Sequence, residues 1–190
     1  MDARALSSAT VLDAEGASHQ LGELWSDRPA IIVWLRHFGC IYCREQAREY
    51  TAVDATLDSA GVRLAFVGNG TPRAARWFHD RFTPEATVLT DPGLRTYRLI
   101  GARSGLLSTV GPRTWGHALR ALRRGARQGM VRGRAFQQGG TLVMAPGDRV
   151  LYRHISAAAG DHPDPADVVE AACNAAGGVE GVRLAAVGNV

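Results

Sequence analysis

Two of the three cysteines in this 190-residue chain, Cys40 and Cys43, lie in the stretch RHFGCIYCREQ with the spacing Cys-x-x-Cys. Two thiols at this spacing can cycle between dithiol and disulfide, supply two ligands to a metal, or simply pack. A structural zinc site needs four ligands, and the sequence holds neither a second Cys-x-x-Cys nor a close histidine pair. The pattern therefore favours dithiol redox chemistry without a metal. Cys173, in an Ala-rich segment, is expected to be a buried packing residue.

The position of Cys40, between an apolar run and a segment with helical spacing, favours its ionisation. Unpaired amides at a helix start stabilise a thiolate, which lowers the thiol pKa by roughly one unit from about 8.5. Cys40 is therefore the predicted nucleophile, and Cys43, one turn later and expected to be less exposed, is the predicted resolving thiol. Gly39 is expected to leave the Cys40 sulfur approachable. Three basic residues could add to the ionisation: Arg36, His37 and Arg44. His37 and Arg44 are catalytic candidates, and His37 is the preferred one.

The segments that must position these residues alternate between two patterns. Continuous apolar runs predict buried strands, and helical periodicity predicts helices, in the order strand 29–38, helix 43–60, strand 62–68, helix 72–82 and strand 86–91. A β-hairpin over 140–155 and a helix over 164–177, with Asp164 as its N-cap, complete the chain. The order predicts an α/β fold of the thioredoxin type, with a central mixed sheet flanked by helices.

Residues 101–138 interrupt this alternation with an Arg-rich insertion. All 22 basic residues of the chain are Arg, and ten lie between Pro92 and Gly147, where no acidic residue occurs. The spacing predicts a basic amphipathic helix, which could be a solvated surface helix, a lid, an anionic-ligand site or a membrane-surface contact. Residues 1–176 are expected to form one domain, and residues 177–190, which repeat an earlier GVRLA-VGN pattern, a flexible tail.

Composition limits the classes of function. The apolar share of 46% and the charged share of 21% are ordinary for a globular protein. The arginine excess fits coding bias, and no nucleic-acid-binding module accompanies it. No apolar run is long enough for a membrane span, and the N-terminus lacks an apolar signal region, so a cytoplasmic location is expected. No Gly-x-Gly-x-x-Gly follows the first long strand, so no nicotinamide or flavin cofactor is predicted.

Four motifs in order, LRHFGCIYCREQA, VGNGTP, VLTDP and QQGGTLVMAPGDRVLYRHISAAAGDHP, resemble the AhpC/TSA-type peroxiredoxin-like family of the thioredoxin superfamily. The resemblance spans roughly residues 20–176. It implies a thioredoxin-like fold, a thiol-based antioxidant or reductase activity, and Cys40 and Cys43 as the redox pair. Some relatives reduce an endoperoxide with thiol electrons.

Departures from that family concern the substrate pocket. The Pro and Thr of its Pro-x-x-x-Thr-x-x-Cys motif are replaced by Val33 and His37, which argues against efficient hydrogen peroxide reduction. Where thioredoxins have a cis-proline, Gly140 precedes Thr141, and open space for a bulkier organic substrate is expected beside Cys40. The predicted substrate-binding residues are Arg36, Gly39, Gln138, Gly140 and Thr141.

The sequence therefore predicts a thiol oxidoreductase that reduces a peroxide, an endoperoxide or a disulfide and is regenerated by an external dithiol such as thioredoxin. A homodimer is compatible with the sequence. Two alternatives stay open: an enzyme specialised for an organic metabolite in a biosynthetic pathway, whose anionic substrate the inserted arginines would grip, and a non-catalytic binding module with dispensable cysteines.

Overall fold

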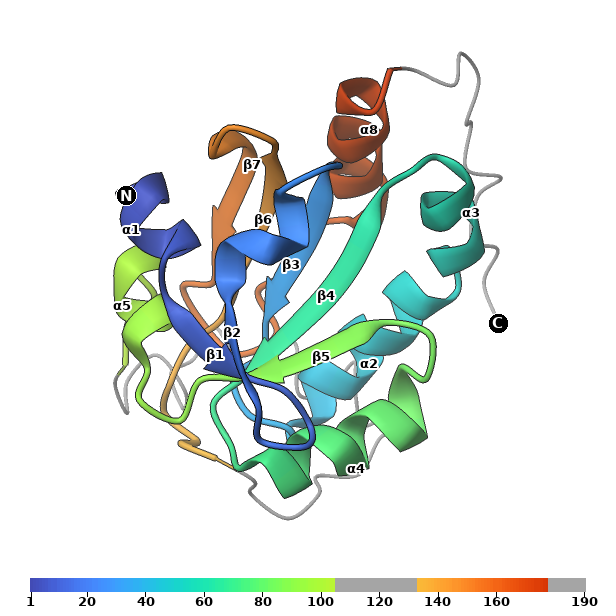
Figure 1. Ribbon diagram of the computed structural model, residues 1–190. Coiled ribbons are helices and arrows are strands. Elements are labelled where there is room, and N and C mark those ends of the chain that lie inside the picture. The colour runs from blue at the N-terminus through green and yellow to red at the C-terminus, as the bar shows by residue number, and fades with distance from the viewer. Residues whose placement is uncertain (105–132, 178–190) are drawn as a thin grey trace.

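A seven-stranded mixed sheet forms the centre of the computed structural model, which describes residues 1–104 and 133–177 (Figure 1). The strands are β1 (Thr10–Leu12), β2 (Ser18–Gln20), β3 (Ala30–Trp34), β4 (Arg63–Gly68), β5 (Thr87–Thr90), β6 (Gly140–Ala145) and β7 (Arg149–Ile155), in the spatial order β2-β1-β5-β4-β3-β6-β7. The helices are α1 (Ala3–Ser7), the 3₁₀ helix η1 (Leu21–Trp25), α2 (Ile41–Thr51), α3 (Asp54–Ser59), α4 (Pro72–Phe82), α5 (Arg95–Ile100) and α8 (Pro165–Ala175).

The middle of the sheet is parallel and its flanks are antiparallel. β3 pairs in parallel with β4, and β4 with β5, so these three strands end at the same edge of the sheet. β6 runs antiparallel to β3, and β7 antiparallel to β6. This confirms the predicted α/β fold with a mixed sheet and a terminal hairpin. Every residue of β3 is buried, as expected for a strand covered on both faces.

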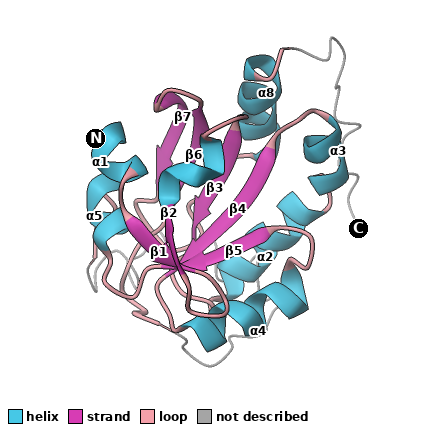
Figure 2. Ribbon diagram, viewed as in Figure 1, coloured by secondary structure: helices cyan, strands magenta, loops and turns pink. Residues whose placement is uncertain are grey.

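Helices cover both faces of the sheet, and Figure 2 shows α2, α3 and α4 on one side and α1 and α5 on the other. Because side chains alternate along a strand, Ile31 and Val33 of β3 join the core under α2, α4 and α8, whereas Ile32 and Trp34 join the core under α1, η1 and α5. Cys40 and Cys43 belong to the first of these cores.

Several predicted boundaries are wrong. The strand expected over 29–38 ends at Trp34, and the helix expected over 43–60 is two helices, α2 and α3. The break follows Thr51, whose hydroxyl bonds back to the Ala47 carbonyl (2.9 Å) and to the Phe82 carbonyl (3.3 Å), a pattern that bends helices. Most of the predicted insertion (105–132) and most of the predicted tail (178–190) lie outside the described residues.

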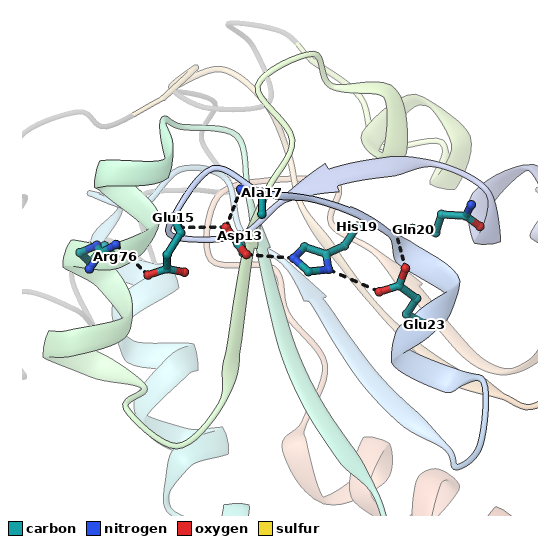
Figure 3. A network of polar contacts seen from close by, with 7 residues as sticks. All are labelled: Asp13, Glu15, Ala17, His19, Gln20, Glu23 and Arg76. Atoms are coloured by element: carbon teal, nitrogen blue, oxygen red, sulfur yellow. Dashed lines mark hydrogen bonds and ion pairs between the residues drawn. The ribbon is translucent and has the colours of Figure 1, made fainter.

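The hairpin of β1 and β2 was not predicted, and polar contacts hold it in place (Figure 3). His19 lies between two carboxylates, at 2.9 Å from Asp13 and 3.4 Å from Glu23. The pKa of His19 is raised, chiefly by its hydrogen bond with Asp13. An ion pair of 2.7 Å from Glu15 to Arg76 joins the same hairpin to α4. Strands of three residues are too short to show a periodic sequence pattern, so this hairpin could not be predicted from the sequence. Its side-chain contacts hold it in place.

Candidate active site

The two cysteines lie where the sequence places them, at the start of α2. A five-residue loop, 35–39, connects the end of β3 to Cys40, which is the N-cap residue of α2, and Cys43 lies in the first turn. The loop is fixed to the sheet because the Leu35 N–H donates to the Val67 carbonyl (2.8 Å) and the Phe38 ring occupies the space that a Cβ on Gly68 would fill. The position of the sulfurs is therefore set by β4 as well as by β3.

Both sulfurs are more enclosed than predicted. Cys40 is 1% exposed and Cys43 is 4% exposed, so the expected approachable Cys40 and the expected difference between the two are wrong. The Arg36 side chain contributes to the cover, since its Nη1 lies 3.7 Å from the Cys40 sulfur. In this conformation Cys40 presents almost no surface to a substrate.

The environment separates the acidities of the two thiols. A hydrogen bond from the Cys43 thiol has the largest effect on the pKa of the Cys40 thiol, and it lowers this pKa. Burial raises the pKa, whereas the Arg36 charge and the backbone N–H groups of Cys43 and Tyr42 lower it further. Together they lower the pKa of the Cys40 thiol to about 6. Burial, and then the hydrogen bond and charge of Cys40, raise the pKa of the Cys43 thiol well above its usual value. At neutral pH, Cys40 is thus the thiolate and Cys43 keeps its proton.

His37 does not supply the positive charge predicted for it. Burial, with further contributions from the charges of Arg36 and Arg44, lowers the pKa of His37 to about 4, so the ring is neutral at pH 7. Its Nδ1 accepts a hydrogen bond from the Gly39 N–H (3.2 Å), which shapes the turn before Cys40. Arg44 donates to the Gly39 carbonyl (3.3 Å) and stacks over the Phe82 ring. Of the three predicted basic residues, Arg36 is the one in contact with the Cys40 sulfur.

Gly140 does not open space beside Cys40, and this expectation is wrong. Gly140 pairs with Trp34 in the sheet, and a Cβ on it would lie 2.7 Å from the His154 carbonyl oxygen and 2.9 Å from the Ile155 side chain. The space in front of it is therefore filled by β7. Thr141, the next residue of β6, is fully buried. Neither residue offers a surface to a substrate in this conformation.

Gln138 and its neighbour Gln137 are also buried. The Gln138 backbone N–H donates to the Arg103 carbonyl (2.9 Å). The Gln137 side-chain amide donates to the carbonyls of Ala102 (3.2 Å) and Arg103 (3.3 Å). These bonds fasten the chain before β6 to the residues that follow α5, and they use the backbone of Gln138 and the side chain of Gln137.

One residue of the site, Asn69, was missed. It follows β4 directly, is buried, and donates to the Arg36 carbonyl over 2.6 Å, while its Oδ1 accepts from the Arg134 N–H over 2.7 Å. Arg36 in turn donates from Nη2 to the Ala135 carbonyl over 2.7 Å. A signal for it exists in the sequence, because a polar residue just after a central parallel strand lies at the edge where such sheets bind ligands.

Other features of the described residues give no competing site. A hollow of about 750 Å³ beside the N-terminal hairpin is lined by charged groups that pair with one another, including Asp13 with His19 and Glu15 with Arg76, and it contains none of the cysteines. Within residues 1–104 and 133–177, no cluster of three His, Cys, Asp or Glu side chains could hold a metal. No helix in the same ranges combines the length and the apolar character needed to cross a membrane.

Comparison with known proteins gives matches at the level of family and fold. The family model described as AhpC/TSA antioxidant enzyme matches residues 50–158. The thioredoxin-like protein AAED1, chloroplastic, of Arabidopsis thaliana is 31% identical over 180 residues, which cover 90% of this chain and 73% of that protein. The prostamide/prostaglandin F synthase of Sus scrofa is 30% identical over 165 residues, covering 83% of this chain and 80% of that protein.

Two solved structures share the fold at low sequence identity. Peroxidoxin BcpB from Mycobacterium tuberculosis superposes with a TM-score of 0.63 at 17% identity, covering 88% of this chain and 92% of that chain. Reduced Prx3 from Vibrio vulnificus gives a TM-score of 0.64 at 15% identity, covering 88% of this chain and 95% of that chain. At these identities the likeness concerns the fold alone.

Proposed function

Since this chain belongs to the AhpC/TSA antioxidant enzyme family of thioredoxin-like and peroxiredoxin-like proteins, we propose that it is a thiol-dependent oxidoreductase with Cys40 as nucleophile and Cys43 as resolving thiol. One observation carries the proposal: the Cys43 thiol, the Arg36 guanidinium and the first N–H groups of α2 all stabilise a thiolate at Cys40. The thiolate is the nucleophilic form of cysteine, and a pKa of about 6 keeps Cys40 mostly ionised at neutral pH.

The chemistry then follows from the different protonation of the two thiols. The Cys40 thiolate attacks an oxygen of a hydroperoxide and the O–O bond breaks. The leaving oxygen takes up a proton and departs as an alcohol, or as water from hydrogen peroxide, and Cys40 becomes a sulfenic acid. The Cys43 sulfur attacks the Cys40 sulfur, the S–S bond forms, and water leaves with the Cys43 proton. With a disulfide substrate, the first product is a mixed disulfide, which Cys43 resolves by releasing a thiol.

Regeneration requires two electrons and two protons from outside. An external dithiol such as thioredoxin attacks the Cys40–Cys43 disulfide, passes through a mixed disulfide, and leaves as its own disulfide. The reduced pair is restored without a bound cofactor.

Among peroxides, an organic peroxide is a better candidate substrate than hydrogen peroxide. The relatives named prostamide/prostaglandin F synthase support it, as do Val33 and His37 at the positions where peroxide-reducing relatives carry Pro and Thr.

The test exposes the reduced protein to hydrogen peroxide, to a bulky organic hydroperoxide and to a small disulfide, and follows loss of thiols and formation of the Cys40–Cys43 disulfide by mass spectrometry. Cys40→Ser should abolish turnover, and Cys43→Ser should stop at a sulfenic acid that a dione reagent traps. Cys173→Ser is the matched control, because Cys173 lies in the same core but takes no part in the proposed reaction, and this variant should behave as wild type. Full turnover by Cys40→Ser would refute the proposal, whereas no turnover by the wild-type protein with any of the three substrates would favour a non-catalytic module.

A further inference from the structure

Asn69 has a place in the site that the dithiol mechanism leaves unused. It lies at the end of β4, at the edge of the sheet where the loop 35–39 and the returning chain 133–139 also lie (Figure 1). Its side chain is buried, so both ends of the amide need partners within the protein. Those partners belong to the loop 35–39, which leads to Cys40, and to the returning chain.

The direction of each Asn69 bond is fixed by chemistry. The Arg36 carbonyl (2.6 Å) can only accept, so the amide nitrogen faces it, and the Arg134 N–H (2.7 Å) can only donate, so the amide oxygen faces that group. An aspartate could not donate, and a leucine of similar size could do neither. Asparagine is thus matched to a position between one carbonyl and one N–H.

Arg36 is bound by Asn69 and by the returning chain. Asn69 holds its backbone carbonyl, and the Ala135 carbonyl, next to the residue that Asn69 also binds, accepts from its Nη2 (2.7 Å). The remaining end of the guanidinium, Nη1, lies 3.7 Å from the Cys40 sulfur. A long side chain loses rotamer freedom when it is held at both ends, so these contacts fix the cation in place in advance.

The contact with the returning chain is close. Gly133 has φ of +125°, and a Cβ on it would overlap the Asn69 amide oxygen and lie 3.2 Å from the His37 Cβ. A glycine is needed there both for the backbone conformation and for the approach to Asn69. The chain therefore brings a glycine and an asparagine together at this point from far apart in the sequence.

We infer that Asn69 is a positioning residue, which holds the Arg36 guanidinium against the Cys40 sulfur by tying the loop 35–39 to residues 133–135. This inference rests on the proposed function, since it concerns the same nucleophile. Asn69 does not touch the sulfur; it acts through Arg36. Loss of Asn69 should therefore weaken thiolate stabilisation by Arg36 and leave the contributions of Cys43 and of α2 in place.

The test measures the pH at which alkylation of Cys40 by iodoacetamide is half-maximal, with the alkylated site identified by peptide mass spectrometry. Arg36→Ala should raise this midpoint by about one pH unit, the lower end of the effect of a nearby charge. Asn69→Leu should raise it in the same direction, and the double variant should match Arg36→Ala alone, because the two residues act in series.

Gly133→Ala breaks the same contact from the other side and should also raise the midpoint. Gly147→Ala is its matched control: Gly147 also has positive φ (+76°), but no atom of the described residues lies within 4 Å of a Cβ placed there. This variant introduces similar backbone strain and should leave the midpoint unchanged.

The outcomes separate this inference from the proposed function. A wild-type midpoint in folded Asn69→Leu or in Gly133→Ala, while Arg36→Ala is shifted, overturns the positioning role and leaves the thiol mechanism intact. No shift in Arg36→Ala overturns the inference as well, because nothing would then act through Arg36. Loss of Cys40 as the alkylated site would instead refute the proposed function.

Discussion

The backbone N–H of Arg36 donates to the Cys43 sulfur over 3.2 Å, while the guanidinium of the same residue faces the Cys40 sulfur. Arg36 thus contacts both thiols, Cys43 through its backbone N–H and Cys40 through its charged guanidinium. Because the two thiols also share a hydrogen bond, a change at either sulfur should alter the acidity of the other.

Replacing Cys43 should show how much its thiol donates to Cys40. In Cys43→Ala the donor is lost, and we expect the alkylation midpoint of Cys40 to rise by about one pH unit or more. Cys43→Ser keeps an O–H donor and an acceptor for the Arg36 N–H, so its midpoint should stay nearer to that of wild type. Equal midpoints in the two variants, measured by the same alkylation series, would contradict a donor role for Cys43.

The two arginines near the loop should differ in effect. Arg44 bonds the Gly39 carbonyl and stacks over Phe82, so Arg44→Ala should lower thermal stability slightly and move the Cys40 midpoint less than Arg36→Ala does. Thermal unfolding and alkylation of both variants check this. A larger midpoint shift in Arg44→Ala than in Arg36→Ala would show that Arg44, and not Arg36, is the main cation that stabilises the Cys40 thiolate.

His37 should make stability depend on pH below neutrality. Its pKa is about 4 in the folded protein and about 6.5 unfolded, so between these values the unfolded chain binds more protons and stability falls as pH falls. Well above pH 6.5 the ring is neutral in both states and has no such effect.

Between pH 7 and pH 4.5, this histidine alone should cost about 2 to 3 kcal/mol of the unfolding free energy. His37→Asn keeps an acceptor for the Gly39 N–H without titrating, so it should lose less stability over that interval. Urea unfolding of both proteins at the two pH values measures the difference. Parallel losses would show that His37 is not held neutral.

Gly68 should be required for packing of the cysteine loop. A Cβ at this position would overlap the Phe38 ring, so Gly68→Ala should cost about 1 to 3 kcal/mol of stability by overpacking. Phe38→Leu in the same chain should recover part of that cost, giving a double-mutant coupling. Gly93→Ala, where a Cβ would meet only Asp91 Oδ1 at 3.6 Å, is the control and should be nearly neutral. Simple additivity of the Gly68 and Phe38 changes would contradict this packing.

Local signals predicted much of the fold. The Pro72 start of α4 and the Asp164 cap of α8 depend on neighbours within a few residues, and each is where the sequence places it. The buried run 29–38 likewise predicts β3, although the strand ends earlier, at Trp34. The Cys-x-x-Cys at the start of α2 belongs to the same class, since spacing and helix geometry decide it.

What the sequence did not predict depends on contacts between distant segments. The pairing of Asn69 with Arg134 and the filled space in front of Gly140 follow from where the chain returns after the insertion, which no periodicity encodes. The neutrality of His37 follows from burial, which lowers its pKa. The helix end alone predicted a shift of roughly one pKa unit for Cys40; the Cys43 hydrogen bond and the Arg36 charge make it larger.

The most direct test of the central claim is the pKa of the Cys40 thiol, obtained from its alkylation rate between pH 4 and pH 10. Cys40→Ser provides the background, since Cys43 and Cys173 both have raised pKa values. A half-maximal rate near pH 6, lost in Cys40→Ser, is the result expected of an ionised nucleophile. A midpoint of about 8.5 or higher, or modification of Cys43 before Cys40, would contradict it.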